Sequence, residues 1–374
     1  MKKVAVFGIG RMGLAITHCM SRLGYYVIGV DSNENAAGDF RKIINSTPED
    51  KNGIFYDCNK RNYKEIIPDF ERPEVVISSL PFHQNKELAQ FCIDSGVRYC
   101  DLGGRVDVSR FINQYATENA NFPVMTDLGL APGWVNILAE QGFSELHRPV
   151  ESVEMMVGGL PANFDANPPL NYLLTWSMDG LINEYKDDCE VLVNGEIKTV
   201  EGMSGHEKIY IKLLGEELEA FCTSGGASHT LRDMQRRDVK NCFYKTLRFK
   251  GHRDIVHGLI KKANLEDDVV SKFFEKTCPP SPYGDIVIIR VVVRAGSVSF
   301  EKEIIVGYSN PFTAMQRATA SPISAVAALM AEGVLDERFI ERRSYKQKLS
   351  HVLTYKDIPF DKFTDNLELL EIQS

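Results

Sequence analysis

The sequence lacks the features that mark several large classes of protein. It has no excess of basic residues, since 43 Lys and Arg stand against 51 Asp and Glu, a net charge of −8. An acidic chain with no basic stripe argues against nucleic acid or an anionic membrane surface as partner. No apolar run approaches the ~20 residues of a membrane span. The chain begins directly with its first predicted strand, so we expect no signal peptide.

Patterns that would indicate disulfides or metal sites are also missing. The eight cysteines form no C-x-x-C pair, and the eight histidines form no H-E-x-x-H or similar grouping. Scattered cysteines favour reduced, mostly buried thiols, so we expect a cytoplasmic protein without a bound metal. There is no internal repeat and no low-complexity segment. A hydrophobic content of 44% over 374 residues allows two domains with cores of their own.

The start of the chain does carry a specific pattern. A short apolar run, Val4–Phe7, is followed by Gly8-Ile9-Gly10-Arg11-Met12-Gly13, a helical stretch and a second β-branched run that ends in Asp31. This order is the dinucleotide-binding fingerprint of a Rossmann domain. Gly8 permits a tight turn, Gly10 lets the backbone approach a pyrophosphate, and Gly13 permits close packing of the helix. Residues 8–13 are therefore expected to hold the cofactor at a helix N-terminus.

The acid at Asp31 indicates which cofactor is bound. A carboxylate at this position accepts hydrogen bonds from ribose hydroxyls and repels a 2′-phosphate. The next residues, Ser32-Asn33-Glu34, offer no arginine to bind such a phosphate. We therefore predict NAD in preference to NADP. Further cofactor contacts are expected from Ser32, from Asp57 at the adenine edge, and from Ser79-Leu80-Pro81 after the fourth strand.

Alternating strands and helices in the first third predict a parallel, doubly wound α/β sheet. Later strands are expected at 53–57, 74–81, 97–101 and 123–127, with helices at 34–44, 62–67, 83–95 and 108–119 between them. Ligands bind beyond the carboxyl ends of such strands. Asp101 and Asp127 each end a strand there, which places two carboxylates where a substrate would meet a nicotinamide. Each also fits a turn or an N-cap acid.

The pattern changes after Gly129 towards strands, which predicts a second, α+β domain with a mostly antiparallel or mixed sheet. We expect a dinucleotide-binding domain over 1–127, a substrate and dimerisation domain over 128–309, and C-terminal helices over 310–374 that pack back on the first domain. Strands are expected at 150–159, 190–193, 217–223, 244–249, 285–294 and 297–308, and helices at 170–184, 230–239, 254–263 and 311–333.

Several longer strings resemble the saccharopine dehydrogenase-like superfamily, and within it most of all the lysine 6-dehydrogenases, which are deaminating enzymes. These strings are Asp101-Leu102-Gly103-Gly104 and the segments 127–138, 176–185, 218–226 and 245–252. The resemblance implies a split Rossmann domain, an α/β domain that dimerises and hence a homodimer. It also implies an NAD-dependent oxidoreductase that acts on the ε-amine of lysine and produces a semialdehyde, which cyclises to a piperideine carboxylate.

Such a reaction needs a group that takes a proton from the amine and a cation or N–H groups that hold a carboxylate. The candidate catalytic residues are Asp101, Asp127 and His252. The candidate substrate-binding residues are Arg105, Trp176, Thr223 and Arg232. Each has an ordinary alternative: a lone histidine is more often a core or surface residue, Arg105 fits an exposed loop, and Trp176 fits packing.

Two other functions stay open. One is a reductase of the saccharopine or carboxynorspermidine type, which joins an amine to a carbonyl acid. Those relatives usually have an aspartate where this chain has Ala131, which favours the deaminating reaction. The other is a protein that binds NAD as a sensor or interaction module without turnover. The two carboxylates at strand ends argue for an enzyme.

Overall fold

The computed structural model describes residues 1–46, 53–60, 62–65, 67, 72–163, 170–278, 284–344 and 352–372. The chain divides into two compact units. Unit 1 contains Met1–Trp134 and Thr319–Ser374, and unit 2 contains Val135–Ala318. Unit 1 is therefore built from two segments that are separated in the sequence by the whole of unit 2.

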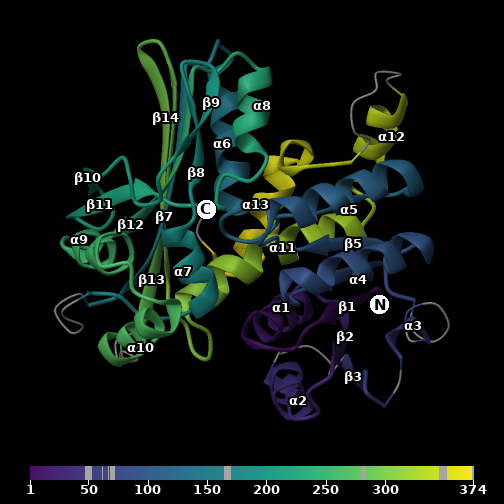
Figure 1. Ribbon diagram of the computed structural model, residues 1–374. Helices are drawn as coiled ribbons and strands as arrows, with labels where there is room; N and C mark the ends of the chain where they lie inside the picture. Colours follow the sequence, from purple (N-terminus) through teal and green to yellow (C-terminus); the bar gives the residue numbers. More distant parts are fainter. Residues whose placement is uncertain are drawn as a thin grey trace. The chain divides into compact units, whose positions relative to one another are not determined.

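A six-stranded parallel sheet forms the centre of unit 1, in the order β3-β2-β1-β4-β5-β6 (Figure 1). Its strands are short apolar runs whose side chains are mostly buried, as expected where helices cover a parallel sheet. The predicted doubly wound α/β fold is confirmed. The strands are β1 (Lys3–Phe7), β2 (Tyr26–Asp31), β3 (Gly53–Asp57), β4 (Val75–Ser78), β5 (Arg98–Asp101) and β6 (Val124–Met125).

The helices and strands of this unit follow the predicted ones, with one helix and one strand that are shorter than expected. The helix expected over 62–67 is reduced to α3 (Tyr63–Glu65), and residue 66 lies outside the described part. The strand expected over 123–127 is reduced to β6, because Asp127 adopts a left-handed backbone conformation with φ of 63°. The other joining helices are α1 (Arg11–Arg22), α2 (Ala36–Ser46), α4 (Phe82–Asp94) and α5 (Val106–Asn119).

The C-terminal segment of unit 1 is tied to its N-terminal segment by hydrogen bonds. Lys2 Nζ donates to the Ala331 carbonyl at 2.9 Å, and the Tyr25 hydroxyl donates to Glu332 at 2.9 Å. Arg98 pairs with Asp336 at 2.7 Å. These contacts join the residue before β1, the turn between α1 and β2, and β5 to the end of α11 (Ala314–Ala331), to α12 (Asp336–Ser344) and to the turn between them. A last helix, α13 (Phe360–Leu369), follows.

Unit 2 contains an eight-stranded mixed sheet, in which β10-β11-β12-β7-β13-β14 form one path and β8 pairs with β12 and β9. Among the described strands of this sheet, β7 and β12 are the only pair that is parallel. Asn194-Gly195 and Ala295-Gly296 form hairpin turns that join the antiparallel pairs β8–β9 and β13–β14. The strands are β7 (Ser152–Pro161), β8 (Cys189–Val193), β9 (Glu196–Val200), β10 (Glu207–Ile211), β11 (Glu216–Cys222), β12 (Asn241–Arg248), β13 (Asp285–Ala295) and β14 (Val298–Gly307).

The helices of unit 2 differ from the prediction in two places. The helix expected from Leu170 begins only at Met178, because the Ser177 hydroxyl accepts a hydrogen bond from Gly180 N and so caps the helix there. A helix over Asp267–Thr277 was not expected. The helices are α6 (Trp134–Leu146), α7 (Met178–Lys186), α8 (Thr230–Arg236), α9 (His252–His257), which continues as a π-helix (Gly258–Lys262), and α10 (Asp267–Thr277).

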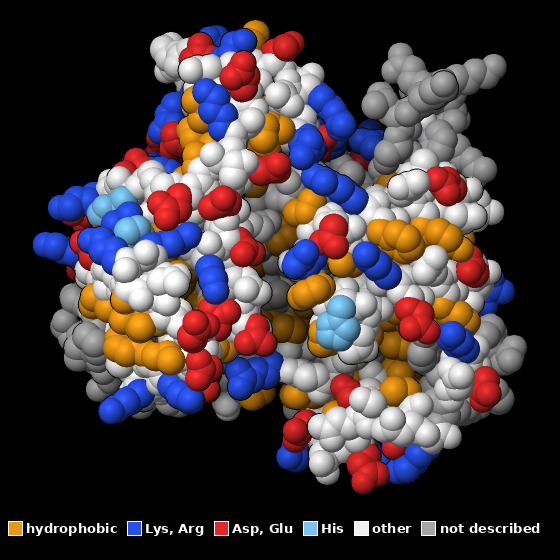
Figure 2. All heavy atoms as spheres, in the orientation of Figure 1, with side chains coloured by type: hydrophobic (Ala, Val, Ile, Leu, Met, Phe, Trp, Pro, Cys, Tyr) orange, Lys and Arg blue, Asp and Glu red, His pale blue; other side chains and the backbone are white. Residues whose placement is uncertain are grey.

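The surface and the helix lengths add two observations. On the face seen in Figure 2, Lys and Arg side chains are interspersed with Asp and Glu, as expected for a chain with a small net negative charge.

In the described part of the chain, none of the individual helices has both the length and the apolar composition that a membrane span needs. The bent pair of α11 and α12 meets that test together, by length and composition only, although most side chains of α11 are buried within the protein.

Candidate functional site

The three glycines of the loop after β1 have different physical reasons to be glycine. Gly8 has φ of +85°, and an added Cβ there would lie 3.1 Å from the Ser79 backbone. An added Cβ at Gly13 would lie 1.8 Å from the Gly8 carbonyl oxygen. At Gly10 an added Cβ would meet nothing within 4 Å. The packing of unit 1 therefore requires Gly8 and Gly13, whereas Gly10 leaves open space of the kind that a closely approaching ligand needs.

The open space at Gly10 lies at the N-terminus of α1. Gly10 is the N-cap residue, and as a glycine it has no side chain that could accept a hydrogen bond from the first N–H groups of the helix. The first N–H groups of a helix lack partners within the helix, and the helix dipole favours an anion beside them. This end of α1 thus fits the pyrophosphate of a dinucleotide, as the sequence predicts.

Asp31 closes this loop from the end of β2. Its Oδ2 accepts a hydrogen bond from Ile9 N at 2.6 Å, and its Oδ1 accepts one from Asn33 N at 2.7 Å. The half-buried carboxylate therefore lies against the glycine loop. This is the place from which it would meet a ribose, and that role stays a prediction.

The segments after β2 and β3 are joined beside Asp31. Asp57 pairs in register with Asp31, and its carboxylate accepts from Asn59 N at 2.9 Å, which lowers the pKa of Asp57. Lys60 Nζ lies 3.2 Å from Asp57 and 2.7 Å from Glu34. Asn59 also donates to the Ser32 carbonyl. Ser32 and Asp57 therefore lie at one edge of the predicted cofactor site. The lysine at this edge, Lys60, is paired with two acids, Glu34 and Asp57.

The turn after β4 contacts the glycine loop. The Ser79 hydroxyl donates to the Gly8 carbonyl at 2.5 Å, and the Leu80 side chain approaches Gly8. Pro81 then caps α4. The strand order reverses between β1 and β4, and ligands of doubly wound sheets bind at such a reversal. Ser79-Leu80-Pro81 thus adjoins the loop that we expect to bind the cofactor.

Asp101 and Asp127 lie next to each other at the ends of β5 and β6. Asp101 is 1% exposed, and its Oδ1 accepts from Asp127 N at 3.1 Å and from Gly103 N at 2.9 Å. Tyr99 donates to Asp101 Oδ2 at 3.0 Å. Burial, together with the neighbouring Asp127 carboxylate, raises the pKa of Asp101 to about 7. The structure thus brings the two predicted carboxylates together.

Asp127 is the more exposed acid of the pair. Its Oδ1 accepts a hydrogen bond from the Ser109 hydroxyl at 2.7 Å. Gly103 has φ of +81°, and an added Cβ there would lie 2.4 Å from that same oxygen, so both the backbone conformation and the space favour a glycine beside the carboxylate. Sequence reasoning did not find Ser109 or Tyr99, because a serine within a helix and a tyrosine within a strand carry no distinctive pattern.

In unit 2, His252 belongs to a buried hydrogen-bonded chain. Arg248 Nε donates to the Tyr185 hydroxyl at 2.7 Å, and that hydroxyl lies 3.0 Å from His252 Nε2. Tyr185 therefore donates onward to Nε2, and His252 Nδ1 donates to the Leu170 carbonyl at 3.1 Å. Burial, and then the charge of Arg248, lower the pKa of His252 to about 3. The imidazole is neutral, with both nitrogens engaged, and its role in catalysis stays a prediction.

Trp176 and Thr223 contribute to polar contacts around the same helix, α7. Trp176 Nε1 donates to the Tyr172 hydroxyl at 3.0 Å, and Tyr172 packs edge-on against His252. Thr223 donates to Glu184 Oε1 at 3.0 Å. Arg248 and Glu184 were not predicted. The signal that could have found them is their position inside the two strings that resemble the family, 245–252 and 176–185.

The two arginines predicted to bind a carboxylate have side chains that are exposed or partly exposed. Arg105, in unit 1, has a side chain that is 58% exposed and pairs with Asp107 at 3.0 Å. Arg232, in unit 2, has a side chain that is 43% exposed and lies 3.4 Å from Glu190. Each arginine already has an acidic neighbour, and their roles in substrate binding stay predictions.

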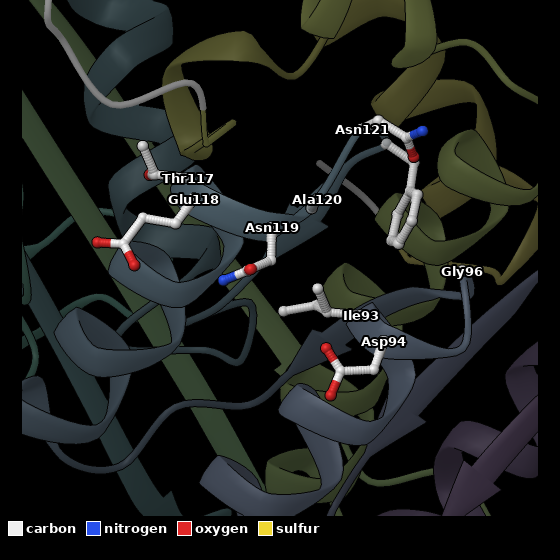
Figure 3. A pocket seen from close by; sticks show the side chains of 9 residues that line it. Ile93, Asp94, Gly96, Thr117, Glu118, Asn119, Ala120 and Asn121 are labelled. Carbon is white, nitrogen blue, oxygen red and sulfur yellow. The ribbon is translucent and has the colours of Figure 1, made fainter.

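A surface pocket of 540 Å³ lies elsewhere on unit 1. Side chains at the ends of α4 and α5 surround it, among them Asp94, Glu118 and Asn119 (Figure 3). The pocket residues precede β5 and β6 in the chain, so the pocket lies at the amino ends of those strands. Asp101 and Asp127 lie at the opposite ends, and the pocket is no part of the predicted cofactor site.

The glycine loop at the reversal of a parallel sheet, the acid after β2 and the carboxylate pair define a dinucleotide-binding oxidoreductase. Comparison with known families agrees. Residues 4–123 match the saccharopine dehydrogenase NADP binding domain, and residues 129–342 match the saccharopine dehydrogenase C-terminal domain. The chain belongs to the saccharopine dehydrogenase family and is an NAD(P)-dependent enzyme of that type.

Curated relatives show a partial match. The chain is 23% identical over 262 residues to the saccharopine dehydrogenase [NADP(+), L-glutamate-forming] of Schizosaccharomyces pombe, which covers 69% of this chain and 56% of that one. It is 30% identical over 204 residues to the mitochondrial alpha-aminoadipic semialdehyde synthase of Rattus norvegicus, which covers 54% of this chain and 21% of that one. The matched region thus spans about half, or less, of these relatives' length.

A solved structure shows the same fold over the whole chain. Apo saccharopine dehydrogenase (L-Glu forming) from Saccharomyces cerevisiae superposes with a TM-score of 0.74 and 15% identity, and covers 98% of this chain and 97% of that one. At this identity the likeness concerns the fold alone. The comparisons establish the family, and they contain no particular support for lysine 6-dehydrogenase.

Proposed function

We propose that this enzyme oxidises the CH–NH group of an amino acid, and that its substrate is L-lysine, which loses its ε-amine. The observation that carries the proposal is the pair of adjacent carboxylates, Asp101 and Asp127, at the strand ends of the sheet that bears the glycine loop. The family, together with relatives whose names refer to saccharopine and aminoadipic semialdehyde, supports a place in lysine metabolism.

The residues of unit 1 supply the proton chemistry. A nicotinamide, when bound, accepts a hydride from the carbon that bears the amine. Before that the amine must lose a proton, because an ammonium has no lone pair to support loss of hydride. Asp127 is the acid of the pair that a substrate can reach, and its oxygen is held by Ser109. Asp101 holds the backbone N–H groups of Asp127 and Gly103 and so positions the turn.

We propose NAD as the preferred cofactor. Gly8, Gly10 and Gly13 would hold the pyrophosphate, and Asp31 would accept from the ribose hydroxyls. The surroundings of the ribose would contain three acids, Asp31, Glu34 and Asp57, and one lysine, Lys60. This lysine is already paired with Glu34 and Asp57. Negative charge disfavours a 2′-phosphate. The homodimer implied by the resemblance is likewise a proposal.

The test is a panel of amino acids with the purified protein and NAD at alkaline pH. Formation of NADH on addition of L-lysine is the expected result. A second candidate is a saccharopine-type reductase, which the family match itself favours. Oxidation of NADH with an amine plus 2-oxoglutarate, and no reaction with lysine, would replace the first candidate by this one. Dinucleotide binding without turnover on any amino acid would indicate a sensor.

A further inference from the structure

Glu184, on α7, has an unusual set of neighbours for a carboxylate. The Thr223 hydroxyl donates to its Oε1 at 3.0 Å, and the Thr246 hydroxyl donates to the same oxygen at 2.5 Å. The two hydroxyls lie 2.8 Å from each other, and both threonines are buried. Glu184 itself is half-buried. Thr246 on β12 and Thr223, the residue directly after β11, therefore fix one oxygen of this side chain.

Within the described part of unit 2, Glu184 forms no ion pair. Among the described residues, no lysine, arginine or histidine nitrogen lies within 4 Å of its carboxylate. Other acids of unit 2 do have such partners, for example Glu140 with Arg237 at 2.7 Å and Glu207 with Lys245 at 2.5 Å. The segments of unit 2 outside the described part, 164–169 and 279–283, contain no lysine, arginine or histidine. Glu184 is therefore a partly exposed carboxylate that a cationic ligand can pair with.

Arg248 is a buried cation of unit 2, but it is not the counter-ion of Glu184. Its guanidinium donates to Tyr185 and to the Leu247 carbonyl, and it lies over the Tyr172 ring at 4.7 Å. It interacts with Glu184 only at longer range. Burial and then the charge of Glu184 raise the pKa of Tyr244, so that hydroxyl is neutral. The Glu184 carboxylate is thus held in one orientation by two threonine hydroxyls, and no cation is paired with it in the described part of unit 2.

We propose that Glu184 binds an ammonium group of the substrate, with Thr223 and Thr246 holding the carboxylate in place. This inference rests on the proposed amino acid substrate. In oxidation of an amine the reacting nitrogen must be neutral, so a carboxylate that forms an ion pair with it would oppose the reaction. The ammonium that Glu184 holds is therefore the one that does not react. For lysine that group is the α-ammonium, and Glu184 selects substrates that carry it.

The test compares ligands with and without that group on the full-length protein. Dissociation constants are measured by calorimetry for L-lysine and for 6-aminohexanoate, which lacks the α-ammonium, in the presence of NADH. Glu184→Gln should weaken L-lysine roughly 10- to 100-fold, the loss expected for a charge-assisted hydrogen bond, and leave 6-aminohexanoate within about twofold. Glu217→Gln removes a charge from an exposed position of β11 and should change neither.

Two further variants separate binding from folding. Thr223→Val should weaken L-lysine and spare 6-aminohexanoate, whereas Thr223→Ser, which keeps the hydroxyl, should restore the wild-type value. Equal weakening of both ligands by Glu184→Gln, or no weakening, would overturn the inference. So would a wild-type protein that binds neither ligand. Selective loss of L-lysine binding in a protein that does not oxidise lysine would retain the inference and reject the proposed function.

Discussion

Asp31 contacts two backbone positions through separate oxygens, Ile9 N and Asn33 N. The sequence predicts this acid as a ribose ligand, because it follows the second strand at the usual spacing. The sequence could not show that the same carboxylate also fastens the glycine loop. One side chain therefore shapes the loop and is positioned to discriminate between cofactors, and its removal should affect both.

The first prediction concerns Asp31→Ala. We expect the KM for NAD to rise roughly 10- to 100-fold, as for the loss of hydrogen bonds to a charged group. The preference for NAD over NADP, measured as the ratio of kcat/KM values, should fall. Asp31→Asn keeps the shape and lacks the charge, so it should reduce the preference with a smaller change in KM. An unchanged NAD affinity in Asp31→Ala would show that Asp31 does not contact the ribose.

The second prediction concerns pH and Asp101, whose pKa is raised to about 7 by burial and by Asp127. An unfolded aspartate has a pKa of about 3.9. The folded state therefore binds this proton more tightly, and the stability from this group is fully present below about pH 4 and is lost as pH rises to about 7. The loss is on the order of a few kcal/mol.

Asp101→Asn cannot ionise and should flatten this decline. Urea unfolding of the wild type and the variant, at several pH values between about 4 and 8, gives the free energy of unfolding as a function of pH. The difference between the two curves isolates Asp101 from other titrating groups. Curves that stay parallel over this window would show that Asp101 titrates at its ordinary pKa in the folded protein.

Elements of unit 1 could be predicted from the sequence because each strand is a short apolar run bounded by turn residues. Elements of unit 2 were harder for a physical reason. β9 and β10 are mostly exposed, so hydrophobic alternation is weak along them. The start of α7 depends on the Ser177 cap, and the preceding residues Leu170–Trp176 are apolar enough to imitate a helix while they pack without one.

The third prediction compares two substitutions in the glycine loop, one at Gly13, where an added Cβ clashes with the backbone, and one at Gly10, where it does not. Gly13→Ala places a Cβ 1.8 Å from the Gly8 carbonyl oxygen, so we expect a loss of about 3 kcal/mol or failure to fold. Gly10→Ala meets nothing within 4 Å, so its free energy of unfolding should stay within about 0.5 kcal/mol of wild type. Its Kd for NAD should rise at least about 10-fold, because the new methyl group occupies the space left for the pyrophosphate.

Thermal unfolding without cofactor and calorimetric titration with NAD distinguish the two variants. The pair is informative because both changes add one methyl group to the same loop. A Gly10→Ala protein that binds NAD as tightly as wild type would contradict the placement of the pyrophosphate at this position.

At the scale of the whole molecule, the order of the domains could be expected from the change in pattern near Gly129. The contacts that complete unit 1 could not. Lys2 and Glu332 are separated by 330 positions, and their contact leaves no local pattern in the sequence. The same holds for the chain from Arg248 through Tyr185 to His252, which joins β12, α7 and α9. Long-range polar contacts of this kind depend on the final packing.

The fourth prediction concerns unit 1 as a folding unit. Residues 1–134 alone lack the partners of Lys2, Tyr25 and Arg98, and we expect them to unfold at lower denaturant than the intact chain or to remain unfolded. A fusion of residues 1–134 to 319–374 through a flexible glycine-serine linker should fold cooperatively and bind NAD. Circular dichroism and NAD titration of both proteins measure this. Equal stability of the short fragment and the fusion would show that the C-terminal segment is dispensable.

The division of unit 1 into two segments has a consequence for biosynthesis. Along this sequence the ribosome synthesises β1–β6 first, then unit 2, and then the second segment of unit 1 with α12 and α13. Domains generally fold as units during synthesis. Unit 2 is continuous and can therefore fold as soon as its own residues are synthesised, whereas unit 1 reaches its full set of contacts only after its second segment has been synthesised. The synthesis of the dinucleotide-binding unit thus begins before that of unit 2 and is completed after it.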